Sequence, residues 1–192
     1  MGIEKLFRES YKTLSSQWGN AIGATLIFTF IVAVLSFIGG IISIFLELSG
    51  ISYLYAQLLG NLISQPLIII ICAPLLIGFY SFMLNISRNT NPEISTIFSG
   101  FKKKWGKYIL VYIFYLVAVY AGLILFIIPG IYVIIIFSQT WFIMVEDDDI
   151  SAYNALVKSS NMMNGYKTSY FLIILSLTFI YVLILLIGIL TC

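Results

Sequence analysis

The sequence predicts an all-α fold: a polytopic transmembrane helix bundle with about five crossings, six being the alternative, and short cytoplasmic interfacial amphipathic helices. Three observations support this prediction. Of the 192 residues, 61% are hydrophobic and only 9% are charged, whereas about 25% are charged in a typical soluble domain. Several apolar stretches reach or approach the roughly 20 residues that a helix needs to cross a bilayer. The ten lysines and arginines lie before and between these stretches, so charge and apolar character are separated along the chain.

We treat residues 1–192 as a single integral membrane domain that begins with a cytoplasmic amphipathic segment, residues 1–19. The predicted crossings are Ala21–Leu46, Gln65–Ile86, Tyr108–Ile128, Ile131–Val145 and Thr168–Leu190. Pro129 and Gly130 separate the third crossing from the fourth, because proline followed by glycine interrupts a helix and favours a tight turn. We therefore expect these two crossings to form a hairpin with Pro129-Gly130 in its turn, at the outer interface or within the membrane.

Orientation follows from the tendency of lysine and arginine to remain on the cytoplasmic side of a membrane. With five crossings all ten basic residues lie on one side, and the opposite side carries only Glu47. A sixth crossing at Ile41–Leu62 would move the Lys102–Lys104 loop to the other side. We therefore expect Ile41–Leu62 to be an outer interfacial or re-entrant segment, interrupted by Gly50 and Gly60. The expected location is the cell (cytoplasmic) membrane, with the N-terminus cytoplasmic and the C-terminus outside.

Three cytoplasmic segments have the apolar periodicity of interfacial helices. They are residues 1–19, a stripe from Ile94 to Trp105 that follows Asn91-Pro92-Glu93, and a segment from about Ser151 to Met163 that Gly165 would cap. The three tryptophans, Trp18, Trp105 and Trp141, fall near cytoplasmic helix ends, where an amphipathic ring favours the headgroup level. Tyr108 is expected to be an interface anchor for the same reason.

The acidic run Glu146-Asp147-Asp148-Asp149 has two interpretations. Carboxylate oxygens suit Mg²⁺ or Ca²⁺, or a basic partner, at the inner surface. Adjacent side chains cannot all converge on one ion, however, and the spacing of a calcium loop is absent. The alternative is that these acids stabilise the positive end of the helix that starts near Ser151, and we favour it.

Two further sets of residues could be structural or functional. Ala155, Ser159 and Met163 share one helix face, which predicts docking of a short helix against the bundle, with a ligand groove as the alternative. Ser138-Gln139-Thr140 is the most polar run inside a predicted crossing. Such groups usually bond to neighbouring helices, and a substrate path is the alternative.

Four lysines form the densest basic cluster, Lys102, Lys103, Lys104 and Lys107. They are candidate contacts for anionic lipid headgroups, worth about 1 kcal/mol per residue. They could also serve only to set the topology. Small residues four apart, Ala118 with Gly122 and Gly19 with Gly23, give a weak signal for a membrane protein partner or a homo-oligomer.

The composition also argues against several classes of function. The chain has no histidine, and no charged residue lies in the middle of a predicted crossing, where proton relays and ion paths usually need one. Nucleotide-binding loops and the HExxH, GxSxG and CxxC motifs are absent. The net charge of +2 does not suggest a nucleic-acid binder. We therefore expect no enzyme, no catalytic residues, no cofactor, no metal site and no nucleic-acid partner.

Several short motifs resemble a known family. They are Ile128-Pro129-Gly130, the acid Glu146, Ile150-Ser151-Ala152, Ala155, Ser159, Met163 and Gly165, with Leu14, Gln17-Trp18-Gly19, Ala21 and Ile97–Lys102 further upstream. In this order they resemble the bacterial integral membrane family described as domain of unknown function 975, and more loosely the membrane domain of some glycerophosphodiester phosphodiesterases. The resemblance implies a structural role for Pro129, Gly130, Glu146, Ala155, Ser159 and Gly165. Family members commonly have Asp in place of Glu146 and usually six crossings, and the family implies no established reaction.

Three functions remain open at this stage. The first is a non-enzymatic accessory, scaffold or envelope-protection factor that acts through helix and lipid contacts, and we favour it. The alternative is a transporter or permease component for an apolar or zwitterionic substrate, because interrupted helices often line transport sites. An enzyme of lipid metabolism is suggested only by the looser resemblance.

Overall fold

The computed structural model describes residues 3–15, 17–102 and 105–190, with side chains for 8–15, 17–102 and 105–183. Over these residues the chain is helical, without strands. The elements are α1 (Ile3–Leu14), α2 (Trp18–Leu48), α3 (Tyr53–Ser87), the 3₁₀-helix η1 (Ile94–Lys102), α4 (Trp105–Leu125), α5 (Ile127–Ile136), α6 (Thr140–Glu146), α7 (Ala152–Met162) and α8 (Lys167–Leu190). The predicted all-α class is confirmed.

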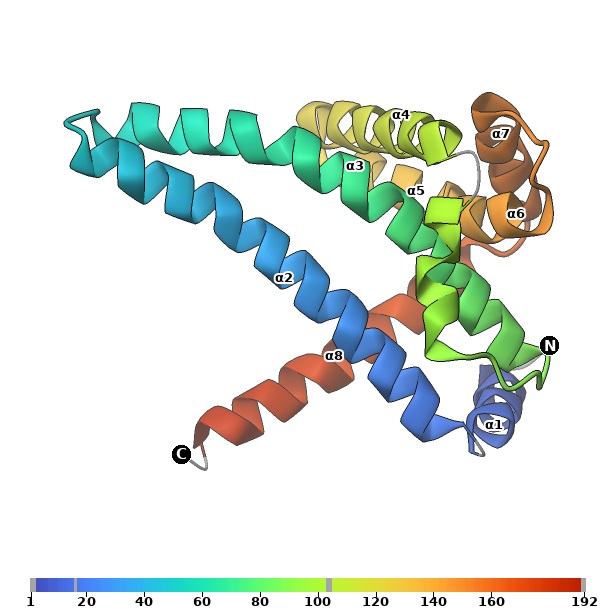
Figure 1. The fold of residues 1–192 in the computed structure, drawn as a ribbon. Coiled ribbons are helices and arrows are strands. Elements are labelled where there is room, and N and C mark those ends of the chain that lie inside the picture. Colours follow the sequence, from blue (N-terminus) through green and yellow to red (C-terminus); the bar gives the residue numbers. More distant parts are fainter. Residues whose placement is uncertain (1–2, 16, 103–104, 191–192) are drawn as a thin grey trace.

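Helices α2 and α3 form a long antiparallel hairpin that projects from the rest of the molecule (Figure 1). Gly50 makes the turn with a φ of 90°, a conformation that side chains disfavour. Near the tip, Gly39 and Ser43 of α2 face Gly60 of α3, and a Cβ at Gly60 would overlap Ser43. The interruption predicted at Gly60 is therefore wrong: Gly60 lies inside α3, where its missing side chain lets the two backbones approach.

The C-terminal half of α3 packs closely against η1 through backbone contacts. α3 contains Pro66 and Pro74, which remove helical hydrogen bonds, and it changes direction along its course (Figure 1). A Cβ at Gly78 would overlap the Ile97 carbonyl, and one at Gly100 would overlap the Pro74 carbonyl. The sequence predicted an amphipathic α-helix with an apolar stripe from Ile94 to Trp105. The structure instead has a 3₁₀-helix over Ile94–Lys102. Three residues per turn put Ile97 and Gly100 on one buried face and leave Phe98 exposed.

Helices α4 and α5 form a second hairpin, but its turn is not where the sequence placed it. The break falls at Phe126, whose φ of −168° and ψ of 160° are extended, and Pro129 lies in the first turn of α5. Proline is tolerated there because the first amide groups of a helix lack acceptors. Gly130 is buried and packs against Gly122 of α4, so close that a Cβ at Gly122 would lie 2.9 Å from the Gly130 Cα. Gly122 therefore packs against α5 of its own chain.

Four stretches of the described chain are long and apolar enough to cross a membrane: α2, α3, α4 and Ile127–Glu146, which combines α5 and α6. Helix α7 and residues Lys167–Leu183 of α8 make a fifth candidate as a pair bent by 89°. The prediction of about five crossings agrees with this range. The helices extend past the predicted crossings, since α3 begins at Tyr53 and the Ile41–Leu62 segment forms the tip of the α2–α3 hairpin.

Replacing Gly78 with alanine should destabilise the protein, because the new methyl group would push η1 away from α3. Overpacking of this kind costs about 1–3 kcal/mol. We expect the unfolding temperature in detergent to fall by several degrees. Gly40→Ala is the matched control, because nothing lies within 4 Å of a Cβ at Gly40. Equal unfolding temperatures for the two variants would contradict the close approach.

Candidate functional site: the polar end of the helix bundle

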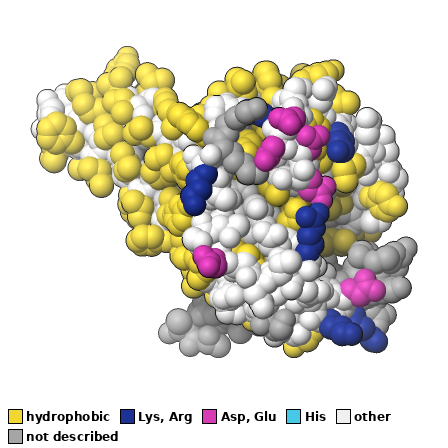
Figure 2. Space-filling model, turned by 45° about the vertical axis from the view of Figure 1, so that its right-hand side comes forward, with side chains coloured by type: hydrophobic (Ala, Val, Ile, Leu, Met, Phe, Trp, Pro, Cys, Tyr) yellow, Lys and Arg dark blue, Asp and Glu magenta, His cyan; other side chains and the backbone are white. Residues whose placement is uncertain are grey.

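Charged side chains gather where α3 and α6 end and α4 and α7 begin, a region that we call the polar end. It comprises Arg88, Lys107, Glu146, Asp147 and Asp148. An ion pair and hydrogen bonds link these residues to one another or to the loop that follows α6. Figure 2 shows basic and acidic side chains on the body of the molecule, while the projecting hairpin is covered mainly by hydrophobic side chains. The polar end is therefore the part of the described chain that suits an aqueous or headgroup environment.

Arg88 at the end of α3 forms an ion pair with Glu146 at the end of α6. The two side chains are 55% and 51% exposed, and exposed pairs contribute little to stability, about 0–1 kcal/mol. Beside the pair is a hollow of about 500 Å³ lined by Ser81, Leu84, Asn85, Arg88, Val145 and Glu146. The pair thus fixes the relative position of two helix ends more than it strengthens the fold.

The loop between α6 and α7 is held by its own acids and by a lysine of α4. The Asp147 Oδ1 atom accepts hydrogen bonds from the backbone N–H groups of Asp149 at 3.1 Å and Ile150 at 3.0 Å. Lys107 Nζ donates to the Asp148 carbonyl at 2.7 Å. Ser151 caps α7 by accepting from Asn154 N at 3.2 Å. Within the described residues, no group of three or more His, Cys, Asp or Glu side chains could hold a metal ion.

Between α5 and α6 the chain makes a turn that leaves two backbone groups without helical partners. Ser138 N bonds to the Ile135 carbonyl at 3.2 Å, so Gln139 N loses its usual acceptor. Thr140 N bonds to the Phe137 carbonyl at 3.1 Å, so the Ile136 carbonyl loses its usual donor. In a membrane such groups must be satisfied within the protein.

The hydroxyl of Ser159 on α7 replaces both of these missing bonds. It donates to the Ile136 carbonyl at 2.8 Å and accepts from Gln139 N at 3.2 Å. Ser159 and Ala155, one turn earlier, are fully buried. The structure thus joins Ser159 to the Ser138–Thr140 run, two features that the sequence showed only separately. Thr140 Oγ1 is buried and has no partner among the described residues.

The buried face of α7 packs on α4 and α6 around a set of aromatic rings. Ala152 and Ala155 join Tyr108, Val111 and Met144 in one core cluster. Trp141 is 5% exposed and has its ring centroid 5.9 Å from those of both Tyr112 and Tyr115. The predicted interface roles of Trp141 and Tyr108 are therefore wrong, because both rings are buried in the core. Trp18 and Trp105 are exposed.

The remaining predicted site residues do not form one site. Lys102 is exposed at the end of η1, whereas Lys103 and Lys104 lie outside the described residues. Pro129 and Gly130 lie at the start of α5, the end of the broken stretch opposite Glu146. Gly165, with a φ of 83°, makes the turn between α7 and α8, where side chains would be strained.

Some contacts could not be recognised from the sequence. Arg88 was given only a role in topology, and its partner Glu146 lies 58 positions away. Lys167 Nζ donates to the Tyr132 hydroxyl at 2.8 Å and lies 5.0 Å from the centre of that ring. Only the Asp147 turn had a local signal, since aspartate often accepts from amides two residues on.

Together, the apolar helices, the hairpin contacts and the charged end define an all-helical, multi-pass membrane protein. Residues 107–192 match the model of the family described as "Protein of unknown function (DUF975)". The resemblance to this family is thus confirmed for slightly less than half of the chain, while the upstream motifs lie outside the matched region. No curated protein and no solved structure matches the chain.

Replacing Ser159 with alanine should leave Gln139 N and the Ile136 carbonyl unpaired. A buried unpaired polar group costs about 1–3 kcal/mol, so we expect a clear loss of thermal stability in detergent. Ser160→Ala is the matched control, because Ser160 is only half-buried and lies on the same helix. If both variants unfold at the temperature of the parent protein, the Ser159 hydroxyl does not close the α5–α6 turn.

Proposed function

We propose that the protein is a non-enzymatic membrane accessory or scaffold protein whose polar end contacts anionic lipid headgroups. The observation that carries the proposal is the arrangement of short elements around the polar end. Helix α7 packs on α4 and α6 through Ala155, and η1 packs on the C-terminal half of α3 through Gly100. Both short elements carry exposed charges, such as Lys102 and Lys158. This layer suits the boundary between apolar chains and charged headgroups.

The lysines of the predicted lipid cluster fit this role to different degrees. Lys102 is exposed, so its ammonium group is available to a phosphate. Lys107 bonds to the Asp148 carbonyl, a contact that orients it at the polar end and leaves its positive charge in place. Basic residues near a membrane surface attract anionic lipids by about 1 kcal/mol each. The cluster therefore supports enrichment of anionic lipids around the protein.

The proposal includes an orientation in the cell membrane with the polar end on the cytoplasmic side. The positive charges support it, because moving them across a bilayer is unfavourable. Labelling of single cysteines in a cysteine-free background tests the orientation. We expect Ser10→Cys and Asn91→Cys to react with an impermeant reagent only when the cytoplasmic face is accessible, and Ser49→Cys, at the hairpin tip, only from outside. Reaction of Ser10→Cys and Asn91→Cys from opposite faces would contradict it.

Removal of the cluster charges should reduce the anionic lipid that accompanies the protein. With Lys102, Lys103, Lys104 and Lys107 all changed to glutamine, we expect several-fold less phosphatidylglycerol relative to phosphatidylcholine in nanodiscs excised from a mixed membrane. The matched control changes the same lysines to arginine, which keeps the charge. Mass spectrometry of the retained lipids measures the ratio. An unchanged ratio in the glutamine variant would refute the lipid role of the cluster.

One observation favours the alternative, a transporter for an apolar or zwitterionic substrate. The α5–α6 stretch is broken, and Thr140 Oγ1 is buried with no hydrogen-bond partner in the described part of the chain, as occurs where broken helices line a transport site. Ser159, however, bonds to the backbone groups that such a site would use. Flux of a zwitterionic lipid analogue in sealed proteoliposomes, abolished by Thr140→Val, would favour the transporter over the scaffold.

A further inference from the structure

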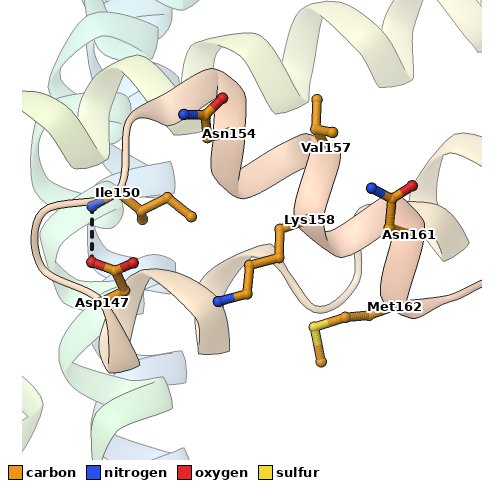
Figure 3. Close-up of a pocket in the computed structure, with 7 residues that line it drawn as sticks. All are labelled: Asp147, Ile150, Asn154, Val157, Lys158, Asn161 and Met162. Atoms are coloured by element: carbon orange, nitrogen blue, oxygen red, sulfur yellow. Dashed lines mark hydrogen bonds between the residues drawn. The ribbon is translucent and has the colours of Figure 1, made fainter.

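The outward face of α7 borders a groove that the predicted lipid cluster does not include. It has a volume of about 700 Å³ and runs between α7 and the loop that precedes it (Figure 3). Its lining residues are Asp147, Ile150, Asn154, Val157, Lys158, Asn161 and Met162. The α7 residues of this set recur at helical spacing and share one face, next to the face that carries Ala155 and Ser159. One face of α7 thus docks the helix while the other forms the groove.

One wall of the groove carries a carboxylate whose orientation is fixed. Two backbone N–H groups, of Asp149 and Ile150, donate to the same oxygen of Asp147, Oδ1. A carboxylate can accept about four hydrogen bonds through its two oxygens. The other oxygen, Oδ2, accepts no hydrogen bond from a described residue, and Figure 3 shows the carboxylate at the edge of the groove. Asp147 therefore places a negative charge, fixed in position by two hydrogen bonds, at the groove.

The other wall carries the ammonium group of Lys158. Lys158 projects from α7 toward the side of the groove where Asp147 lies (Figure 3), and it is exposed. Among the described residues it forms no ion pair or hydrogen bond, and Asp147 and Lys158 do not pair with each other. One negative and one positive group thus face a common hollow without neutralising each other, an arrangement that a ligand carrying both charges would complement.

The lining of the groove is partly apolar. Val157 and Met162 expose 39% and 52% of their surface and line the groove together with Ile150. Asn154 and Asn161, about two turns apart on α7, add amide groups that can bond to ester or phosphate oxygens. The groove lies beside the polar end of an apolar bundle, so an amphiphile can reach it from the bilayer surface.

We propose that the α7 groove binds a glycerophospholipid with a phosphoethanolamine headgroup, Lys158 holding the phosphate and Asp147 the primary ammonium group. This binding rests on the proposed function, because it adds a specific lipid at a second position of the same polar end. Phosphocholine has no N–H to donate to Asp147, and phosphoglycerol has no positive charge to oppose it. Both should therefore bind less tightly than phosphoethanolamine.

Native mass spectrometry of the full chain in detergent tests this proposal. The delipidated protein is titrated separately with palmitoyl-oleoyl phosphatidylethanolamine, phosphatidylcholine and phosphatidylglycerol. We expect the first to bind about fivefold more tightly than the second, the scale of exposed charge pairs. Asp147→Asn should abolish this preference, because asparagine keeps an oxygen for the two backbone N–H groups but loses the charge. Lys158→Gln should weaken both zwitterionic lipids about fivefold and leave their ratio unchanged.

Lys12→Gln, in α1 and outside the groove, is the matched control and should change none of these affinities. The proposal is overturned if Asp147→Asn preserves the preference or if Lys158→Gln has no effect. The enrichment of phosphatidylglycerol that depends on Lys102–Lys104 and Lys107 is a separate readout. If this enrichment is observed but the groove variants have no effect, only the groove proposal fails. If the enrichment is not observed but the groove variants have their expected effects, the groove proposal stands.

Discussion

The hydroxyl group of Ser159 closes a gap in the backbone hydrogen bonding between α5 and α6, and the polar end depends on this contact. A broken helix in a membrane must find substitutes for its missing bonds, because lipid chains offer none. Ser159 supplies one donor and one acceptor from a neighbouring helix. The contact fixes α7 on the bundle, and α7 in turn positions the loop that contains Asp147 and Asp148.

The same arrangement lets one short helix, α7, both pack on the bundle and line a groove. Small buried residues, Ala152, Ala155 and Ser159, let α7 lie close to α4 and α6. A neighbouring face of α7 carries Lys158 and its two flanking asparagines, which line the groove. Glycines act in the same way elsewhere, since Gly78 and Gly100 bring η1 onto α3 and place Lys102 near the ends of the helices.

Much of the fold could be predicted from apolar length and charge placement, because these reflect the bilayer directly. The all-helical class and the approximate number of crossings follow from them. The sequence could not show that Pro129 starts a helix instead of turning the chain, since proline suits both positions. Nor could it show that Trp141 is buried, because tryptophan favours both interfaces and cores. The partners of Arg88 and Ser159 are distant along the chain, and only the folded arrangement pairs them.

Ser159 stabilises the backbone turn at residues 137–139 from a neighbouring helix. The most direct measurement is hydrogen–deuterium exchange of the Gln139 amide in lipid nanodiscs, for the parent chain and for Ser159→Ala. We expect slow exchange in the parent and clearly faster exchange in the variant, with the amides of α4 unaffected. Identical exchange at Gln139 in the two proteins would contradict it.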